Sequence, residues 1–249
     1  MTPADLSLTA AGSRKGNLIL VNRDHPLQGE LIPDLVPLTG GWPGQHLDRT
    51  AARMLSAAIQ AVQGAGQILP VSGWRSQEEQ QAIWDDTLQR EGADFTARYV
   101  ARPGCSEHQT GLAVDLALSA DKIDFIRPAF PRDGVCEAFR RVAARYGFVE
   151  RYTEDKRDKT GIAAEPWHFR YVGVPHARIL TDAGICLEEY PAFLRQAPRV
   201  VLLENGRRVQ VRYLPYTGTD ITRPAPGPCW QLSGTNEGGF ILTVWEGQA

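Results

Sequence analysis

The sequence predicts an α+β fold: a central, mainly antiparallel sheet flanked by helices, followed by a β-rich C-terminal extension. Three observations predict it. Several segments carry apolar residues at helical spacing, short runs typical of strands lie between them, and after residue 198 the chain turns to closely spaced strand-like runs. We therefore expect a main domain over residues 1–198 and an extension over residues 199–249.

Two helices are predicted in the first half of the chain. In residues 47–62 the apolar side chains fall on one helical face, and Gly64 stands where a left-handed C-cap belongs. Ser76 and Glu79 match a capping box, in which each residue bonds the backbone N–H of the other. This pattern predicts a second helix that runs to about residue 90.

The second half of the main domain contains two more helical patterns. Residues 135–146 are amphipathic and are followed by Gly147, which predicts a helix that ends there. A further helix is expected after Pro175, as far as about residue 189. Residues 91–105 have no clear period, so we expect a loop that lies over a pocket.

Strands are predicted for short runs of apolar or alternating residues, namely 17–22, 68–72, 111–116 and 167–172. Small residues alternate with branched ones around Asp115, so its carboxylate lies on the face that leaves space free. His168 and Arg170 share one face of the last run. Pro166 places Glu165 in a turn before that strand.

The C-terminal extension is expected to contain about four strands. Asn205 and Gly206 separate two strand-like runs, which predicts a hairpin with a two-residue type I′ turn. Residues 230–245 add two more strand candidates. Fifty residues bury little apolar surface by themselves, so we expect the extension to pack on the main domain.

Composition excludes some classes of function. The chain has 249 residues and a formal net charge of −2, without the basic run that binds a phosphate backbone, so we expect no nucleic-acid partner. No apolar run is long enough to span a membrane, and the first residues lack the apolar core of a signal peptide. A soluble cytoplasmic protein with four reduced cysteines is therefore expected.

Two motifs supply residues for a metal-dependent hydrolase. SEHQTGLAVD contains His108 and Asp115, and EPWH contains Glu165 and His168. Two imidazoles and one carboxylate form a typical catalytic zinc set, which leaves a coordination position open for water. Glu165 remains as the general base. Arg75, in SGWRS just before a predicted helix, is our candidate for stabilising an oxyanion.

Together these motifs resemble the family of VanY, VanX and VanXY zinc D,D-carboxypeptidases and D,D-dipeptidases, peptidase family M15, with the hedgehog/D,D-peptidase fold. The pattern SxHxxGxAVD is followed by ExWH and preceded by SGWRS, and the run LILVNRDHPL resembles the start of the VanY branch. The resemblance covers about residues 17–195. It implies zinc at His108, Asp115 and His168, Glu165 as base and acid, and Arg75 as the stabiliser of the intermediate.

The same resemblance implies the substrate. Its members hydrolyse D-Ala-D-Ala, either as the free dipeptide or at the end of a peptidoglycan precursor, in vancomycin resistance or in wall recycling. Ser106 occupies the position expected to bind the terminal carboxylate of the substrate. Specificity is expected to depend on the loops at 91–105 and 118–134. The alternatives are an L,D-carboxypeptidase, a cell-wall endopeptidase, or a non-catalytic, zinc-stabilised module that binds peptidoglycan.

Overall fold

The computed structural model of the chain describes residues 5–28, 33–203, 205–223, 226 and 229–246. It divides into two compact units: Met1–Leu20 with Arg178–Ala249, and Val21–Ala177. The boundary predicted after residue 198 lies within the first of these units. No helix in the described part is long and apolar enough to cross a membrane. The cysteines Cys105, Cys136, Cys186 and Cys229 are free in the structure.

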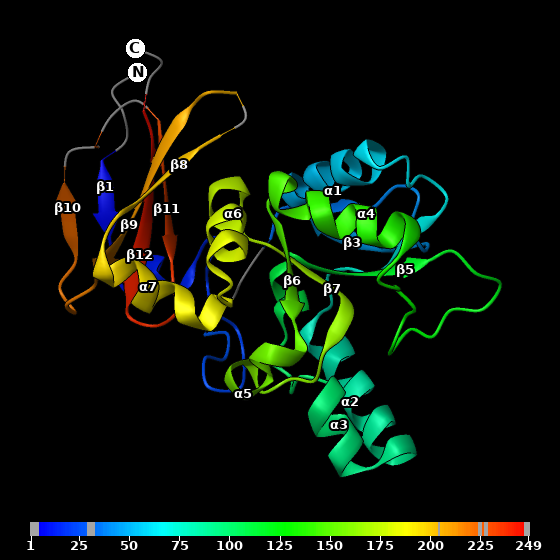
Figure 1. Ribbon diagram of the computed structural model, residues 1–249. Helices are drawn as coiled ribbons and strands as arrows, with labels where there is room; N and C mark the ends of the chain where they lie inside the picture. Colours follow the sequence, from blue (N-terminus) through cyan, green and yellow to red (C-terminus); the bar gives the residue numbers. More distant parts are fainter. Residues whose placement is uncertain (1–4, 29–32, 204, 224–225, 227–228, 247–249) are drawn as a thin grey trace. The chain divides into compact units, whose positions relative to one another are not determined.

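The unit Val21–Ala177 is built on a four-stranded antiparallel sheet with the order β4-β5-β7-β6. This sheet confirms the predicted α+β class (Figure 1). Its strands are β4 (Ile68–Ser72), β5 (Ala113–Leu118), β6 (Phe148–Tyr152) and β7 (Glu165–Tyr171). A separate pair is formed by β2 (Leu35–Pro37) and β3 (His46–Asp48). The helices are α1 (Arg49–Ala61), α2 (Gln77–Glu91), α3 (Ala93–Tyr99), α4 (Gly134–Ala143) and α5 (Arg157–Thr160), with the 3-10 turns η2 (Glu107–Thr110), η3 (Ala144–Tyr146) and η4 (Glu154–Lys156).

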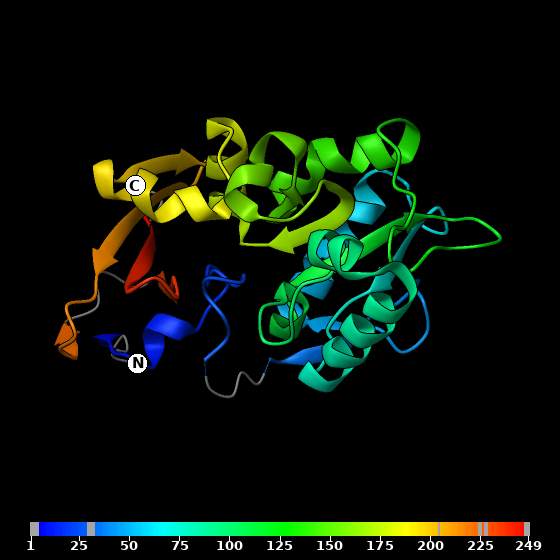
Figure 2. The same ribbon diagram turned by 90° about the horizontal axis from the view of Figure 1, so that it is seen from below.

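The core of this unit lies between α1, α4 and one face of the sheet. Leu55 of α1 and Phe139 of α4 pack with Val114 and Leu116 of β5 and with Phe169 of β7. Since side chains alternate along a strand, these residues turn their neighbours to the opposite face. Helices α2 and α3 lie side by side away from α1 and α4 (Figures 1 and 2). The face opposite the core is therefore the one available for a site.

The predicted helices at 47–62, 76–90 and 135–146 are confirmed as α1, α2, and α4 continued by η3. The capping box of Ser76 and Glu79 is present at the start of α2. The predicted C-cap at Gly64 is wrong, because the left-handed residue is Gln63, with φ +53°. The N–H of Gly64 instead donates to the carbonyl oxygen of Ile59 at 2.8 Å, which satisfies the helix end.

Three further expectations about the elements before residue 190 need correction. Residues 91–105 are not only a loop, because α3 forms after Gly92, whose φ of +83° allows the sharp change of direction between α2 and α3. Glu165 is the first residue of β7 and not part of a turn, since it pairs with Tyr152 at the sheet's outer strand. The helix after Pro175 is α6 (Val174–Ala183), which stops at Gly184, with φ +62°.

Residues 17–21 are buried, but the run 17–22 does not form the predicted strand. Leu18, Ile19, Leu20 and Val21 are each at most 3% exposed. The N–H of Leu18 donates to the hydroxyl of Ser233, and the N–H of Leu20 donates to the carbonyl oxygen of Thr235. Their backbone groups are thus satisfied by a distant part of the chain rather than by a sheet ladder.

The other unit is β-rich, as predicted. Its four-stranded sheet has the order β11-β12-β9-β8. A separate two-stranded sheet is formed by β1 and β10. The strands are β1 (Leu6–Leu8), β8 (Arg199–Leu202), β9 (Arg208–Pro215), β10 (Ile221–Arg223), β11 (Trp230–Gly234) and β12 (Gly239–Trp245). The helical segments are η1 (Gly12–Arg14), η5 (Leu187–Glu189) and α7 (Tyr190–Gln196), together with the end of α6.

The hairpin of β8 and β9 is confirmed, but its predicted type I′ turn is wrong. The N–H of Leu203 donates to the carbonyl oxygen of Arg207, so three residues separate this last pair. The N–H of Gly206 donates to the carbonyl oxygen of Leu203, and Gly206 has φ +76°. One glycine in the left-handed region is typical of a three-residue hairpin loop.

Candidate active site

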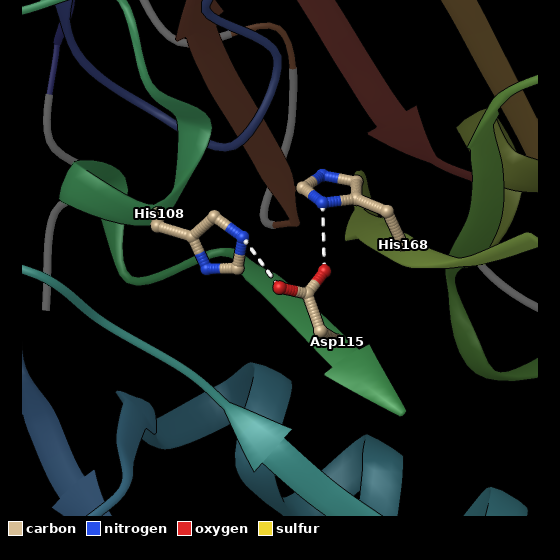
Figure 3. Close-up of side chains that lie close together, drawn as sticks. All are labelled: His108, Asp115 and His168. Carbon is tan, nitrogen blue, oxygen red and sulfur yellow. Dashed lines mark hydrogen bonds and ion pairs between the residues drawn. The ribbon is translucent and has the colours of Figure 1, made fainter. Parts of the chain in front are cut away.

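Three predicted metal ligands converge on the free face of the sheet. Asp115 of β5 and His168 of β7 are direct partners in the antiparallel register, so they project to the same side. His108 reaches them from the turn η2 (Figure 3). One carboxylate oxygen of Asp115 lies 3.2 Å from Nε2 of His108, and the other lies 3.0 Å from Nδ1 of His168.

The residues present fit a zinc ion. One ligand atom from each of His108, Asp115 and His168 lies within 4.8 Å of the others, and all three side chains are buried. Donor atoms that share a tetrahedral zinc with bonds of about 2.1 Å are roughly 3.4 Å apart. The two separations from Asp115 are close to that value. Two imidazoles and a carboxylate are also the donor types that zinc prefers.

A backbone group orients the first imidazole. Nδ1 of His108 lies 2.7 Å from the carbonyl oxygen of Gly73, the residue that directly follows β4. A carbonyl accepts only, so Nδ1 of His108 carries the proton and donates it. Nε2, which faces Asp115, is then left with a free lone pair for a metal.

Burial and charge set the protonation of the site without metal. Burial lowers the pKa of His108 to about 4. For His168 burial acts in the same direction, but hydrogen bonds to two carboxylates outweigh it and raise the pKa to about 9. Burial raises the pKa of Glu165 to about 8. A cation that binds here therefore has to displace a proton from His168.

Glu165 lies beside the three ligands without belonging to the closest set. Its Oε2 atom is 3.8 Å from Nδ1 of His168, and its side chain is 8% exposed. The backbone of the following residue, Pro166, is held by Arg140, whose guanidinium donates to the Pro166 carbonyl oxygen at 2.9 Å. Glu165 is therefore a buried carboxyl held at the edge of the site, with a pKa in the range suited to proton transfer near neutral pH.

Arg75 also reaches the site, through a set of hydrogen bonds that the sequence did not reveal. Its Nη2 donates to Asp115 at 3.1 Å, its Nε to Ser72 at 3.1 Å and its Nη1 to Gln80 at 3.0 Å. Gln80 is itself buried and donates to the carbonyl oxygen of Ala101 at 2.8 Å. The guanidinium is thus directed from three sides. Gln80 lies four residues after Ser76, the N-cap of α2. A polar residue on the inner face of that helix is the feature of the sequence that could have indicated a partner for Arg75.

The sequence reasoning also missed Glu107, which is fully buried next to the predicted ligand His108. It forms ion pairs with Arg151 and Arg170 and lies 3.5 Å from His168. The sequence contained one indication of this residue. Arg170 shares a strand face with His168, and a buried cation needs a carboxylate nearby as its counter-ion.

A cavity of about 700 Å³ opens onto these residues. Ser106 lines it and is only 3% exposed, at the edge of the ligand set. Both predicted specificity loops contribute to its wall: Tyr99, Val100 and Ala101 from one, and Phe125 and Ile126 from the other. The volume is well above that of a dipeptide and within the range of pockets that bind larger molecules.

Comparison with known proteins identifies the family. The model of the VanY family, described as D-alanyl-D-alanine carboxypeptidase, matches residues 44–174. The chain belongs to the VanY family. The resemblance inferred from its motifs is thereby confirmed, and all six predicted site residues lie within the matched range.

Individual relatives agree with the VanY assignment. The chain is 39% identical over 184 residues to the bifunctional D-Ala-D-Ala dipeptidase and D-Ala-D-Ala carboxypeptidase VanXYC of Enterococcus gallinarum, covering 73% of this chain and 97% of the relative. The crystal structure of the vancomycin resistance D,D-dipeptidase VanXYg, in complex with a D-Ala-D-Ala phosphinate analogue, has a TM-score of 0.92 and 42% identity, covering 98% of this chain and 99% of that one.

A second solved structure bears on the metal. It is a mutant of the D,D-pentapeptidase VanY from a VanB-type resistance cassette in complex with Zn(II), with a TM-score of 0.58 and 33% identity. It covers 70% of this chain and 98% of that one. A related VanY protein thus binds zinc, and this chain has a buried His–Asp–His set that fits the same ion.

Proposed function

We propose that this chain is a zinc-dependent D,D-peptidase that hydrolyses the D-Ala-D-Ala bond, both in the free dipeptide and at the end of a peptidoglycan precursor. The observation that carries the proposal is the convergence of His108, Asp115 and His168 at one cavity, with Glu165 and Arg75 beside them. The similarity to bifunctional VanXYC supports the choice of both substrates.

Zinc is proposed to be held by Nε2 of His108, a carboxylate oxygen of Asp115 and Nδ1 of His168. When bound, it supplies Lewis acidity that activates water and polarises the substrate carbonyl. A divalent cation also favours the ionised form of a neighbouring carboxyl, so the Glu165 carboxylate becomes available at neutral pH. The ligands are held by Gly73 and by the strand pairing before any ion arrives.

Glu165 is proposed to transfer the proton in both directions. Its carboxylate accepts a proton from the attacking water, and the carboxylic acid then donates that proton to the nitrogen of the leaving D-alanine. Burial suits both roles, because it keeps the affinity of the carboxylate for a proton high.

Arg75 and Ser106 are proposed to act on the substrate. The guanidinium of Arg75 is charged at all accessible pH values and is directed by Ser72 and Gln80, so it can stabilise negative charge that develops on the carbonyl oxygen. Ser106 lines the cavity, and its hydroxyl is proposed to donate to the terminal carboxylate of the substrate.

We also propose that catalysis belongs to the main domain and that residues 199–249 form an accessory β-rich extension. Every proposed site residue lies in the unit Val21–Ala177, and the cavity is lined by residues of that unit.

Release of free D-alanine tests the function. The zinc-loaded protein is incubated with D-Ala-D-Ala, with a peptide ending in D-Ala-D-Ala, and with a peptide ending in an L,D bond. We expect D-alanine from the first two. Release from the L,D peptide alone supports the alternative L,D-carboxypeptidase, and binding to cell wall without release from any peptide supports a non-catalytic module. The variant Glu165→Ala serves as the inactive control.

A further inference from the structure

A buried cluster of charges lies directly behind His168. The Oε1 atom of Glu107 is 2.9 Å from Nε of Arg151 and 2.9 Å from Nη1 of Arg170. The side chains of these three residues are at most 1% exposed. A buried ion pair is seldom retained for stability alone, because desolvation opposes the Coulombic attraction. We therefore expect the cluster to have a role other than stabilising the fold.

The two oxygens of Glu107 have different surroundings. Both arginines approach Oε1, whereas Oε2 faces Nε2 of His168 at 3.5 Å. Within the described residues, neither Oε2 of Glu107 nor Nε2 of His168 has another hydrogen-bond partner. Both atoms are buried, so each is the polar group that can satisfy the other.

The cluster is built on the same elements as the proposed ligands. Glu107 immediately precedes His108 in η2, and Arg170 follows His168 by two residues on the same face of β7. Arg151 lies in β6, the strand next to β7. A carboxylate held by two guanidinium groups on adjacent strands has little freedom to rotate, so Oε2 stays directed at the imidazole.

We propose that Glu107 is a positioning residue for the metal ligand His168. Oε2 accepts the proton on Nε2, and this contact selects the tautomer whose Nδ1 has a free lone pair directed toward Asp115. Arg151 and Arg170 hold the carboxylate in that orientation. The inference rests on the proposed zinc site, and it gives His168 a partner in the same role as the Gly73 carbonyl has for His108.

The variant Glu107→Gln tests the inference with little change in shape. The amide oxygen of the glutamine accepts from the arginines, so its NH2 group turns toward His168. An NH2 group can only donate, which makes Nε2 of His168 the acceptor and moves the ring proton to Nδ1. That tautomer cannot bind metal through Nδ1. We expect a loss of about 10- to 100-fold in zinc affinity, the range found for outer partners of metal-binding histidines.

Two further variants separate positioning from stability, because Glu107→Gln leaves two buried cations with one counter-charge fewer. The variant Arg151→Lys keeps the charge of the cluster but loses the directed guanidinium contact to Oε1 of Glu107, so its zinc affinity should fall by less than that of Glu107→Gln. The double variant E107Q/R151Q removes one charge of each sign. We expect it to regain part of the stability lost in E107Q while its zinc affinity stays low.

Zinc affinity is measured by competition with a chromophoric chelator, and stability by urea unfolding of the metal-free proteins. Proton–nitrogen NMR of the histidine rings adds a readout that a structural role does not move: the zinc-loaded parent should show a protected Nε2–H of His168, absent in E107Q. Parent-like zinc affinity in a folded E107Q, or its recovery in the double variant, overturns the inference. Failure of the parent itself to bind zinc contradicts the proposed function instead.

Discussion

Replacing Glu165 by glutamine should separate catalysis from metal binding. The amide has the shape of the carboxyl but cannot accept and return a proton. Removal of a general acid–base lowers kcat by about 10²- to 10⁴-fold. At about 1.36 kcal/mol for each factor of ten, the barrier rises by roughly 3 to 5 kcal/mol. Zinc content should stay at the parent level, because Glu165 lies outside the closest ligand set, 3.8 Å from Nδ1 of His168.

The same variant should stabilise the metal-free protein. The pKa of Glu165 is about 8 in the folded protein, against 4.5 for an ordinary glutamate. Below pH 4.5 the carboxyl is protonated in both states. As pH rises from there to about 8, the unfolded chain ionises while the folded protein keeps its proton, so the parent loses stability. At 1.36 kcal/mol per unit this amounts to about 3 kcal/mol by pH 7, which the glutamine variant does not lose.

Three measurements check this prediction together: D-alanine release, zinc content after dialysis, and urea unfolding with a chelator at pH 5 and pH 8. The stability advantage of Glu165→Gln should grow between the two pH values and shrink when zinc is added, since a cation offsets the buried charge. Parent-like D-alanine release by the variant would refute the catalytic role. A stability advantage that does not depend on pH would refute the argument from burial.

Other substitutions test the remaining parts of the site and the fold. His108→Gln should remove stoichiometric zinc after dialysis, whereas retained zinc in metal analysis contradicts its role as a ligand. Arg75→Lys should keep zinc but lower kcat by about 10²- to 10³-fold, because an ammonium cannot reproduce the directed guanidinium bonds; an unchanged kcat speaks against oxyanion stabilisation. Burial lowers the pKa of His176 to about 3, so the folded protein keeps it neutral and loses stability as pH falls from its ordinary value of 6.5. Urea unfolding of the metal-free proteins checks this: between pH 7 and pH 5 the free energy of unfolding of the parent should fall by about 2 kcal/mol more than that of His176→Gln. An equal fall in both proteins contradicts the assignment.

Elements whose signals are local could be predicted from the sequence. The capping box of Ser76 and Glu79 forms as expected, because both partners lie within one helical turn. The face of β7 that carries His168 was assigned correctly, since alternation along a strand depends on neighbours only.

The errors concern features that depend on distant residues. Residues 17–22 have the composition of a strand, yet Leu18 bonds to Ser233, a partner 215 positions away. Helix α3 was overlooked because its seven residues are too few for a period to be visible, and its start depends on the positive φ of Gly92. The loop after β8 was assigned from the Asn205–Gly206 pair, although the N–H of Leu203 donates to the carbonyl oxygen of Arg207, so the last backbone pair encloses three residues.

For this protein, the sequence by itself determines which residues are available for chemistry: two histidines, an aspartate and a glutamate at the spacings of a known zinc peptidase family. Only the tertiary structure decides how they are held. Pairing of β5 with β7 sets Asp115 opposite His168, and the turn at Glu107 brings a buried carboxylate behind that imidazole. Strand register and side-chain contacts across more than fifty residues arise from packing the whole unit, so no local pattern contains them.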